Sequence, residues 1–279
     1  MGINSGYFKV ILAAFIWGTI GIFTRWSQLA PLDLAFYRVL IASVALFLVL
    51  PRGQRLLILH TKHCLLIILA GILFALDNLL FFYSIQLTSL SNAALPYNMQ
   101  PVFMALLAPI ILNEKMKARY VFSFLFAVVG VGVLLTPALI NISYADIAGI
   151  SYALTGALLL AVIAIIARII NIESITFVYY QMLVATLCLL PFVKITSLAN
   201  IDTAVIILIL ALVHTAVAYV LYYDGLKTIS IQHVVALTYL IPVVASLTGY
   251  FLFQENITLY TVVGGLIIIV NGVMVVFRN

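Results

Sequence analysis

Two ionisable side chains, Asp77 and His214, interrupt stretches that are otherwise almost entirely apolar. Asp77 lies near the middle of residues 63–84, and His214 lies within residues 203–223. A charge at the centre of a bilayer costs about 2.5 to 3.5 kcal/mol on insertion scales, so each side chain must face protein or water. Asp77 could take up a proton or pair with a ligand's ammonium group, and His214 could share the proton-coupling role. The alternative is structural, because both could simply hydrogen-bond between helices, Asp77 to Asn78, a tyrosine or His214.

Aromatic and polar side chains are expected at the same membrane depth. Such rings can line a pocket and attract a cationic group, an interaction worth about 2 kcal/mol or more when desolvated, although simple packing would explain each ring equally well. Tyr83, Tyr222 and Tyr223 lie near predicted helix ends, where anchoring at the membrane interface is expected. The predicted substrate-binding residues are Trp17, Asp77, Asn78, Tyr97, Asn98, His214, Thr238 and Tyr239.

Three prolines lie inside predicted membrane helices, namely Pro96 and Pro101 in one and Pro242 in another. Proline removes a backbone donor and leaves the carbonyl four residues earlier without its partner, so we expect these helices to bend. Polar backbone freed in this way is tolerated only against protein or a water-filled cavity. The bends could therefore flank a ligand site and serve as rocking points, or they could be static kinks.

Arg38 lies inside an apolar stretch and needs a partner. Asp33 is close in sequence and Glu255 is predicted on the same side of the membrane, so a structural ion pair or an external gate is expected. Glu114, beside Lys115, is expected to be a solvated charge at a helix end. Small residues should allow close helix approach, and the last helix could form a homodimer contact. These are Gly18, Gly21, Gly264, Gly265 and Gly272.

The elements that would position these side chains follow from composition. Of 279 residues, 66% are hydrophobic and 8% are charged, whereas a soluble domain has about 25% charged residues. The sequence therefore predicts an all-α polytopic membrane protein, with helices of about 20 apolar residues. No cleavable signal peptide is evident. The ten predicted spans are 7–26, 31–50, 63–84, 91–112, 119–136, 146–168, 174–193, 203–223, 231–252 and 258–277.

The second half of the chain repeats landmarks of the first. A shift of 141 positions superposes Pro101 on Pro242 and Glu114 on Glu255. Five helices in each half, residues 1–140 and 141–279, mean that the second half must enter the membrane inverted, as in many secondary transporters. Two inverted five-helix repeats around a central cavity are therefore predicted. Basic residues gather on one side of this topology, which places both termini in the cytoplasm.

Several segments resemble the drug/metabolite transporter superfamily in its EamA-like branch. They are "AAFIWG" (13–18), "LAFYRVLIA" (34–42), the proline, apolar run and glutamate of 101–114 and 242–255, and "VGGLIIIVNGVMVV" (263–276). The resemblance covers essentially the whole chain. It implies ten helices, two inverted halves and a central substrate cavity, but it does not imply a particular substrate. Gln181 in the second half replaces Arg38 of the first, so the charged landmarks are not symmetric.

These observations favour a secondary transporter of a small polar metabolite, an amino acid or organic cation, in the cytoplasmic membrane of a bacterium. A flippase for a lipid or lipid-linked sugar is the alternative, and an intramembrane enzyme is a remote one. The four histidines and two cysteines show no metal-ligand spacing, and there is no phosphate-binding loop, so no metal or cofactor is expected. The basic residues are spread as loop anchors, so membrane lipids and a small molecule, and no nucleic acid, are the expected partners.

Overall fold

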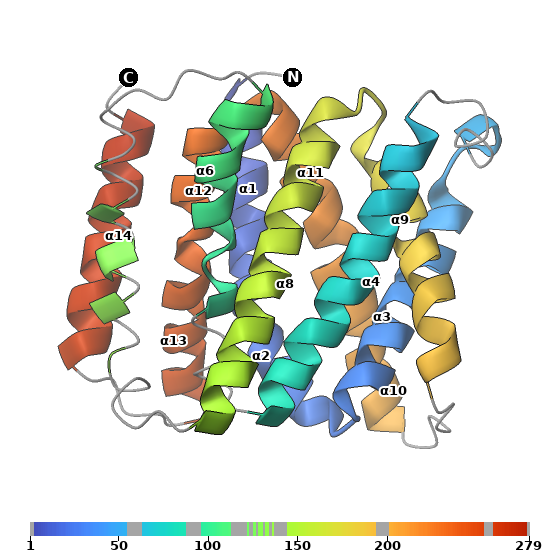
Figure 1. Cartoon of the computed structure of the whole chain (residues 1–279), viewed down its shortest axis with the longest axis horizontal. Helices are drawn as coiled ribbons and strands as arrows, with labels where there is room; N and C mark the ends of the chain where they lie inside the picture. Colours follow the sequence, from blue (N-terminus) through green and yellow to red (C-terminus); the bar gives the residue numbers. More distant parts are fainter. Residues whose placement is uncertain are drawn as a thin grey trace.

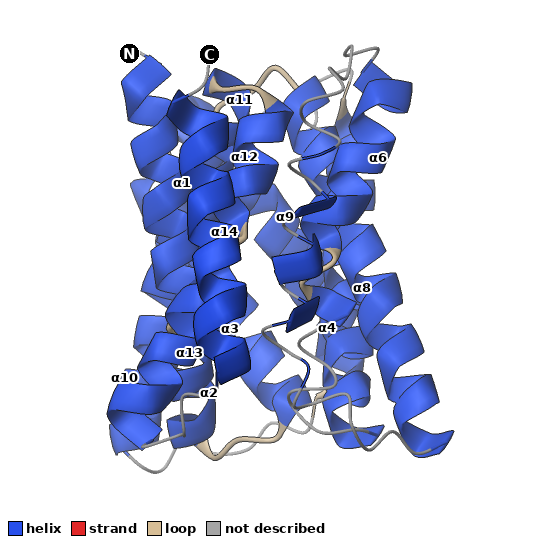
Figure 2. Ribbon diagram, turned by 90° about the vertical axis from the view of Figure 1, so that its left-hand side faces the viewer, coloured by secondary structure: helices blue, strands red, loops and turns tan. Residues whose placement is uncertain are grey.

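The computed structural model describes residues 3–54, 63–87, 96–112, scattered positions between 122 and 136, and residues 144–193, 201–253 and 259–277. Within these ranges the chain is a bundle of helices that run roughly parallel or antiparallel to one another (Figure 1). Both termini lie at the same end of the bundle (Figures 1 and 2). We call this the termini end.

Helices form here because the segments are long and apolar, so that their backbone groups are satisfied internally. Seven described helical stretches are long and apolar enough to cross a membrane. The described helices are α1 (Ile3–Gly18), α2 (Ile20–Ser27), α3 (Pro31–Val49), α4 (Cys64–Leu87), α6 (Gln100–Leu112), α8 (Tyr144–Ile169), α9 (Ser174–Leu189), α10 (Ile201–Ile209), η4 (Leu210–Val217), α11 (Ala218–Thr228), α12 (Ile231–Thr238), α13 (Leu240–Phe253) and α14 (Leu259–Phe277), with short 3-10 turns η1 (Arg52–Gln54) and η3 (Leu190–Phe192).

All predicted spans except 119–136 overlap helices that the structure describes, although the span 91–112 is described only from residue 96. Only scattered positions are described between 119 and 136, so the predicted fifth helix lies largely outside the described residues. Glu114, Lys115 and Glu255, which the sequence placed at helix ends, also lie outside them. The expectation of a predominantly helical membrane protein is confirmed for the described part of the chain.

Several described helices are separated from the next by a short interruption. A break at Thr19 separates α1 from α2, a turn at Asn98 and Met99 precedes α6, and Tyr239 separates α12 from α13. The helix formed by α10, η4 and α11 carries a π-helical segment, η4. Such π segments are rare and occur frequently at functional sites.

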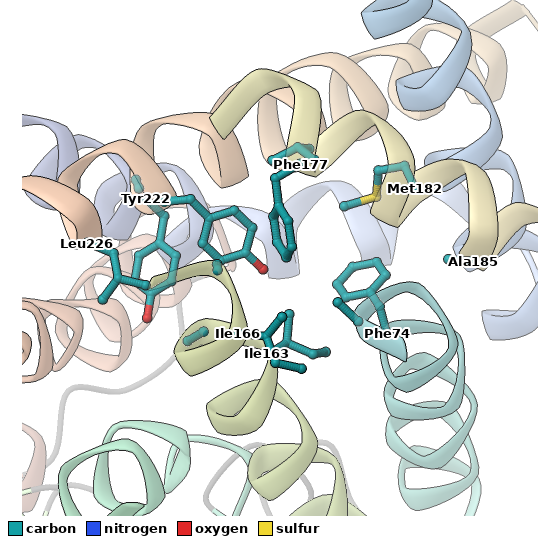
Figure 3. Packing of buried hydrophobic residues seen from close by; sticks show 14 of the residues in the cluster. Phe74, Ile163, Ile166, Phe177, Met182, Ala185, Tyr222 and Leu226 are labelled. Atoms are coloured by element: carbon teal, nitrogen blue, oxygen red, sulfur yellow. The ribbon is translucent and has the colours of Figure 1, made fainter. Parts of the chain in front are cut away.

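The core lies where the helices of the two halves of the chain pack together. α4 contacts α8 and α9, α3 contacts α9 and η4, and α1 contacts α11 and α13. Figure 3 shows Phe74 of α4 meeting Phe177 and Met182 of α9 in this core. A Cβ built on Gly18 would lie 2.5 Å from Cβ of Val244. The close approach of α1 to α13 therefore requires glycine there.

Three sequence-based expectations about packing need correction. Tyr222 and Tyr223 are 2% and 1% exposed, so they are core residues and not interfacial anchors. Helix α11 continues to Thr228, beyond the predicted end at 223, and this extension carries both tyrosines inward. Gly21 has no described neighbour within 4 Å of a built Cβ, so it does not mediate a close helix contact in the described part of the chain. Tyr83, in contrast, is 53% exposed.

Candidate functional site

Asp77 is buried on α4, in the interior of the bundle. Its Oδ2 accepts a hydrogen bond of 3.0 Å from the hydroxyl of Tyr97, just before α6. Its Oδ1 has no hydrogen-bond partner among the described residues. A Cβ built on Gly156 of α8 would lie 2.9 Å from this oxygen and 3.3 Å from Cε2 of Tyr97. Glycine at 156 therefore leaves the space that the carboxyl group and the tyrosine ring occupy.

Arg38, on α3, reaches into the same region. Its Nε donates a 3.1 Å hydrogen bond to Oγ1 of Thr215, whose hydroxyl donates in turn to the Leu210 carbonyl at 2.8 Å. This second bond spans five residues and matches the π-helical spacing of η4. The charge of Arg38 also acts on Asp77. Thr215 and Asp77 are thus two partners of Arg38 that the sequence did not suggest. Glu255, one of its two expected partners, lies outside the described residues.

His214, the residue before Thr215 in η4, has hydrogen-bond partners in α1 and at the break that follows α1. Its Nε2 lies 3.0 Å from Oγ1 of Thr19, at the break between α1 and α2. The Thr19 hydroxyl also lies 2.7 Å from the Ile16 carbonyl, and Nδ1 of His214 lies 3.5 Å from the Ile209 carbonyl. Both ring nitrogens of His214 therefore have a hydrogen-bond partner. The backbone carbonyl of His214 accepts a 3.1 Å bond from Nε1 of Trp17. His214 therefore binds both the Trp17 indole and Thr19, at the break between α1 and α2.

An aromatic cluster joins α1, α4 and α11 beside these polar groups. The Trp17 ring lies 4.9 Å from that of Tyr219 and 5.1 Å from that of Tyr222. Phe74 packs edge-on against Tyr219 at 5.2 Å. The Tyr222 hydroxyl accepts a 3.4 Å bond from Nε2 of Gln100. The rings thus connect the first half of the chain to the second at the level of the buried charges.

The remaining predicted residues have more local roles in this conformation. Asn78 donates to the Phe74 carbonyl on its own helix at 2.7 Å. Thr238 likewise bonds carbonyls of its own helix, at 2.9 and 3.1 Å. Tyr239 is buried, and its hydroxyl has no partner among the described residues. Asn98 is partly exposed at the turn before α6.

The predicted prolines flank the helix interruptions. Pro96 is buried immediately before the turn at Asn98, and Pro101 is the second residue of α6. Pro242 is the third residue of α13, just after the break at Tyr239. Proline is tolerated in a first helical turn, since the donor it lacks has no partner there. The chain thus restarts a helix at Pro101 and at Pro242 after a break.

The structure brings Asp77 and Tyr97 into direct contact and places Trp17 against His214. Asp77 and His214 do not share a hydrogen bond in the described part of the chain, but the charge of Arg38 acts on both. Sequence reasoning missed Arg38, Thr215, Thr19, Tyr219 and Gly156 as members of this region. Arg38 carried a usable signal, because a mid-membrane cation requires a partner near its own depth.

The part of the chain that the structure describes contains no group of three or more His, Cys, Asp or Glu residues that could hold a metal ion. The site consists of one buried carboxyl group, one buried guanidinium, an imidazole and several phenol and indole rings. Such an arrangement can bind a polar molecule through charge-assisted hydrogen bonds and aromatic contacts.

Apolar spanning helices, helix interruptions and buried ionisable groups define an integral membrane protein of the transporter class. The sequence pattern of the EamA-like transporter family matches residues 4–136 and again residues 147–278. The chain belongs to this family, as the resemblance indicated, and the double match shows two repeats. Family membership indicates a transporter and not an enzyme.

Similar proteins agree with this assignment. The uncharacterized transporter YxxF of Bacillus subtilis is 27% identical over 249 residues, covering 87% of this chain and 80% of that protein. An uncharacterized transporter of Archaeoglobus fulgidus is 26% identical over 279 residues, covering 98% and 97%. A solved crystal structure matches with a TM-score of 0.83 over 99% of this chain and 97% of the other; at 16% identity this supports the fold alone.

Proposed function

We propose that the protein is a secondary transporter that carries a small polar metabolite, an amino acid or an organic cation, across the cytoplasmic membrane of a bacterium by alternating access. The observation that carries this proposal is the placement of Asp77 among helices of both repeats, with one carboxyl oxygen that has no partner among the described residues. Ionisable groups inside a membrane are costly and are therefore rarely kept without a function.

Two inverted halves, residues 1–140 and 141–279, are part of the proposal. Helices that correspond under the sequence shift pack in corresponding pairs: α1 contacts α11 and α13, as α8 contacts α4 and α6. Likewise, α3 contacts η4 and α9 contacts α4. Five crossings in each half would reverse the second half relative to the first. Exchanging the conformations of such halves would expose a central site first on one side and then on the other.

The breaks at Asn98 and Tyr239 support a role for helices of both repeats in this exchange. The two residues are counterparts under the shift of 141 positions, and each precedes a helix that starts with a proline in its first turn. Broken helices at mid-membrane commonly form transporter substrate sites, because free backbone groups are available there. We place the moving parts of the transport cycle at these breaks.

The proposed orientation puts the termini end in the cytoplasm. Lys9 forms an ion pair of 3.2 Å with Asp224, near the end of α11. Arg168 bonds the carbonyls of Leu226 and Ile229 at the end of that helix. Together with Lys227, which bonds the Ile172 carbonyl at 2.6 Å, these side chains form a basic cluster near the ends of α8 and α11. Cytoplasmic loops of membrane proteins carry such an excess of Lys and Arg.

A thermal-shift screen of the purified protein tests the proposal. Amino acids, amines, nucleosides and sugars are compared for their ability to raise the unfolding temperature of the wild type and of Asp77→Asn. Asp224→Asn is the matched control, since it makes the same change in the surface ion pair. We expect a compound that stabilises the wild type and the control but not Asp77→Asn.

Transport itself is then measured by counterflow of that compound in sealed liposomes. Accumulation of labelled compound in wild-type liposomes would support a metabolite transporter. Movement of a labelled lipid or lipid-linked sugar between leaflets, with no counterflow of any soluble compound, would replace the proposal by the flippase alternative.

A further inference from the structure

Arg38 and Asp77 carry opposite charges, and both are buried, at 8% and 1% exposure. Separate polar partners hold them, since Arg38 bonds Thr215 at 3.1 Å and Asp77 accepts from Tyr97 at 3.0 Å. Their charges act on each other, but no direct ion pair joins them in the part of the chain that the structure describes. The two form a split ion pair, with its members on α3 and α4.

The geometry leaves hydrogen-bonding capacity on the carboxyl group of this pair. Oδ1 of Asp77 is buried without a partner among the described residues and lies against Gly156 of α8. Nε of Arg38 is fixed by Thr215, which is itself held by the Leu210 carbonyl. A guanidinium has five N–H groups in a fixed fork, so the bond from Nε to Thr215 uses one of the five donors of Arg38.

Among the described residues, the titratable groups that act on the split pair do not add a further fixed charge. Tyr97 and Tyr219 are phenols that interact with Asp77 and with Arg38. Tyr223 of α11 also interacts with Asp77, and His214 faces Arg38 from η4. A neutral imidazole can satisfy both ring contacts of His214, donating from Nδ1 to the Ile209 carbonyl at 3.5 Å and accepting at Nε2 from the Thr19 hydroxyl at 3.0 Å. The local sum of charges is therefore zero when both Arg38 and Asp77 are ionised.

We infer that Arg38 determines which substrate charge the site accepts, because its guanidinium balances Asp77 and makes the site selective for net-neutral dipolar molecules over cations. This inference rests on the proposed function and narrows its two substrate classes. A dipolar molecule can place an ammonium group on Asp77 and an acidic group on Arg38 without changing the net charge. A cation adds an uncompensated charge to a water-poor interior, which is unfavourable.

The first test needs no substrate. Arg38→Gln and Asp77→Asn each leave one buried charge without its counter-charge, whereas the double variant leaves neither. Gln is also the residue that the second repeat carries at the corresponding position, Gln181. We expect the double variant to unfold at a higher temperature than either single variant, which is the signature of coupled charges. Purely additive losses would show that the two charges do not compensate each other.

The second test measures charge selectivity in liposomes with three probes of one skeleton: leucine, its methyl ester and its N-acetyl derivative, which are net-neutral, cationic and anionic. Wild type should transport leucine in preference to both derivatives. Arg38→Gln should shift the ratio of ester to leucine transport upward by at least about tenfold, the effect of one buried charge at short range. Asp77→Asn should shift preference toward the N-acetyl derivative.

Two controls separate charge from structure. Arg38→Lys keeps the charge and should keep the wild-type preference for leucine. Arg52→Gln makes the same change at an exposed arginine and should leave selectivity unaltered. An Arg38→Gln protein that transports the probes with wild-type selectivity would overturn the inference while leaving transport established. If the proposed function is wrong, the wild type will transport no screened compound. The unfolding temperatures of the single and double variants would still test whether Arg38 and Asp77 compensate each other's charge.

Discussion

Replacing Gly156 by alanine adds one methyl group directly in front of Asp77. The new Cβ would lie 2.9 Å from Oδ1 of Asp77 and 3.3 Å from Cε2 of Tyr97, so the carboxyl group must move. Overpacking of this kind costs about 1 to 3 kcal/mol, and alanine recovers about 1 kcal/mol in a helix relative to glycine. The variant should therefore lose roughly 0 to 2 kcal/mol of unfolding free energy and still fold.

Ligand affinity should fall further than stability. A displaced Asp77 carboxyl group would misplace the hydrogen bond that it is proposed to make to the substrate, and a hydrogen bond to a charged group is worth about 1.5 to 3 kcal/mol. If substrate binding requires that geometry, affinity should drop roughly 10- to 150-fold. Isothermal titration of the variant with the compound found by the thermal-shift screen measures this directly.

Two other glycines provide matched controls. At Gly71 an added Cβ would lie 2.5 Å from Cβ of Val184, so alanine there overpacks α4 against α9 away from the Asp77 carboxyl group. At Gly21 no described atom lies within 4 Å, so alanine should be tolerated. Gly71→Ala should reduce stability without reducing the affinity of the folded protein. A Gly156→Ala protein that is destabilised but binds with wild-type affinity would refute the assignment of Asp77 to the binding site.

The remaining predictions concern the helix breaks, the π-helical segment and the topology. Replacing both Pro101 and Pro242 by alanine should slow counterflow more than it weakens binding, because continuous helices would resist rocking; equal losses in both assays would argue against a gating role. Thr215→Val removes the acceptor for Arg38 and should weaken substrate binding about tenfold or more, whereas Thr215→Ser keeps the hydroxyl and should bind normally. Of two reporter enzymes fused after Asn279, one active only in the cytoplasm and one active only outside, the cytoplasmic reporter should show activity. Activity of the outside reporter alone would reverse the proposed orientation.

Hydropathy predicted most of the described helices because each must span the same apolar thickness. The helix interruptions near Pro101 and Pro242 were predictable, because proline lacks a backbone N–H and disturbs the helix at its own position whatever surrounds it. The break at Thr19 and the π-helical segment around His214 carry no such marker. They depend on contacts between helices distant in sequence, such as the bond from Trp17 to the His214 carbonyl.

The errors at Tyr222 and Tyr223 have a similar cause. The predicted helix ended at residue 223 because Asp224 and Lys227 interrupt the apolar run. In the structure Asp224 pairs with Lys9, and Lys227 bonds a backbone carbonyl, so the helix continues to Thr228. Tertiary partners thus extend the helix past its polar residues and bury the tyrosines that precede them. The position of Arg38 beside Thr215 was unpredictable for the same reason, since the partner lies 177 residues away.

Counterflow by wild type and Asp77→Asn, reconstituted in equal amounts in liposomes loaded with the compound from the screen, tests the central claim most directly. Wild type should transiently accumulate the labelled compound, Asp224→Asn should match it, and Asp77→Asn should accumulate no more than protein-free liposomes. Equal accumulation by Asp77→Asn and wild type would show that the buried carboxyl group takes no part in transport.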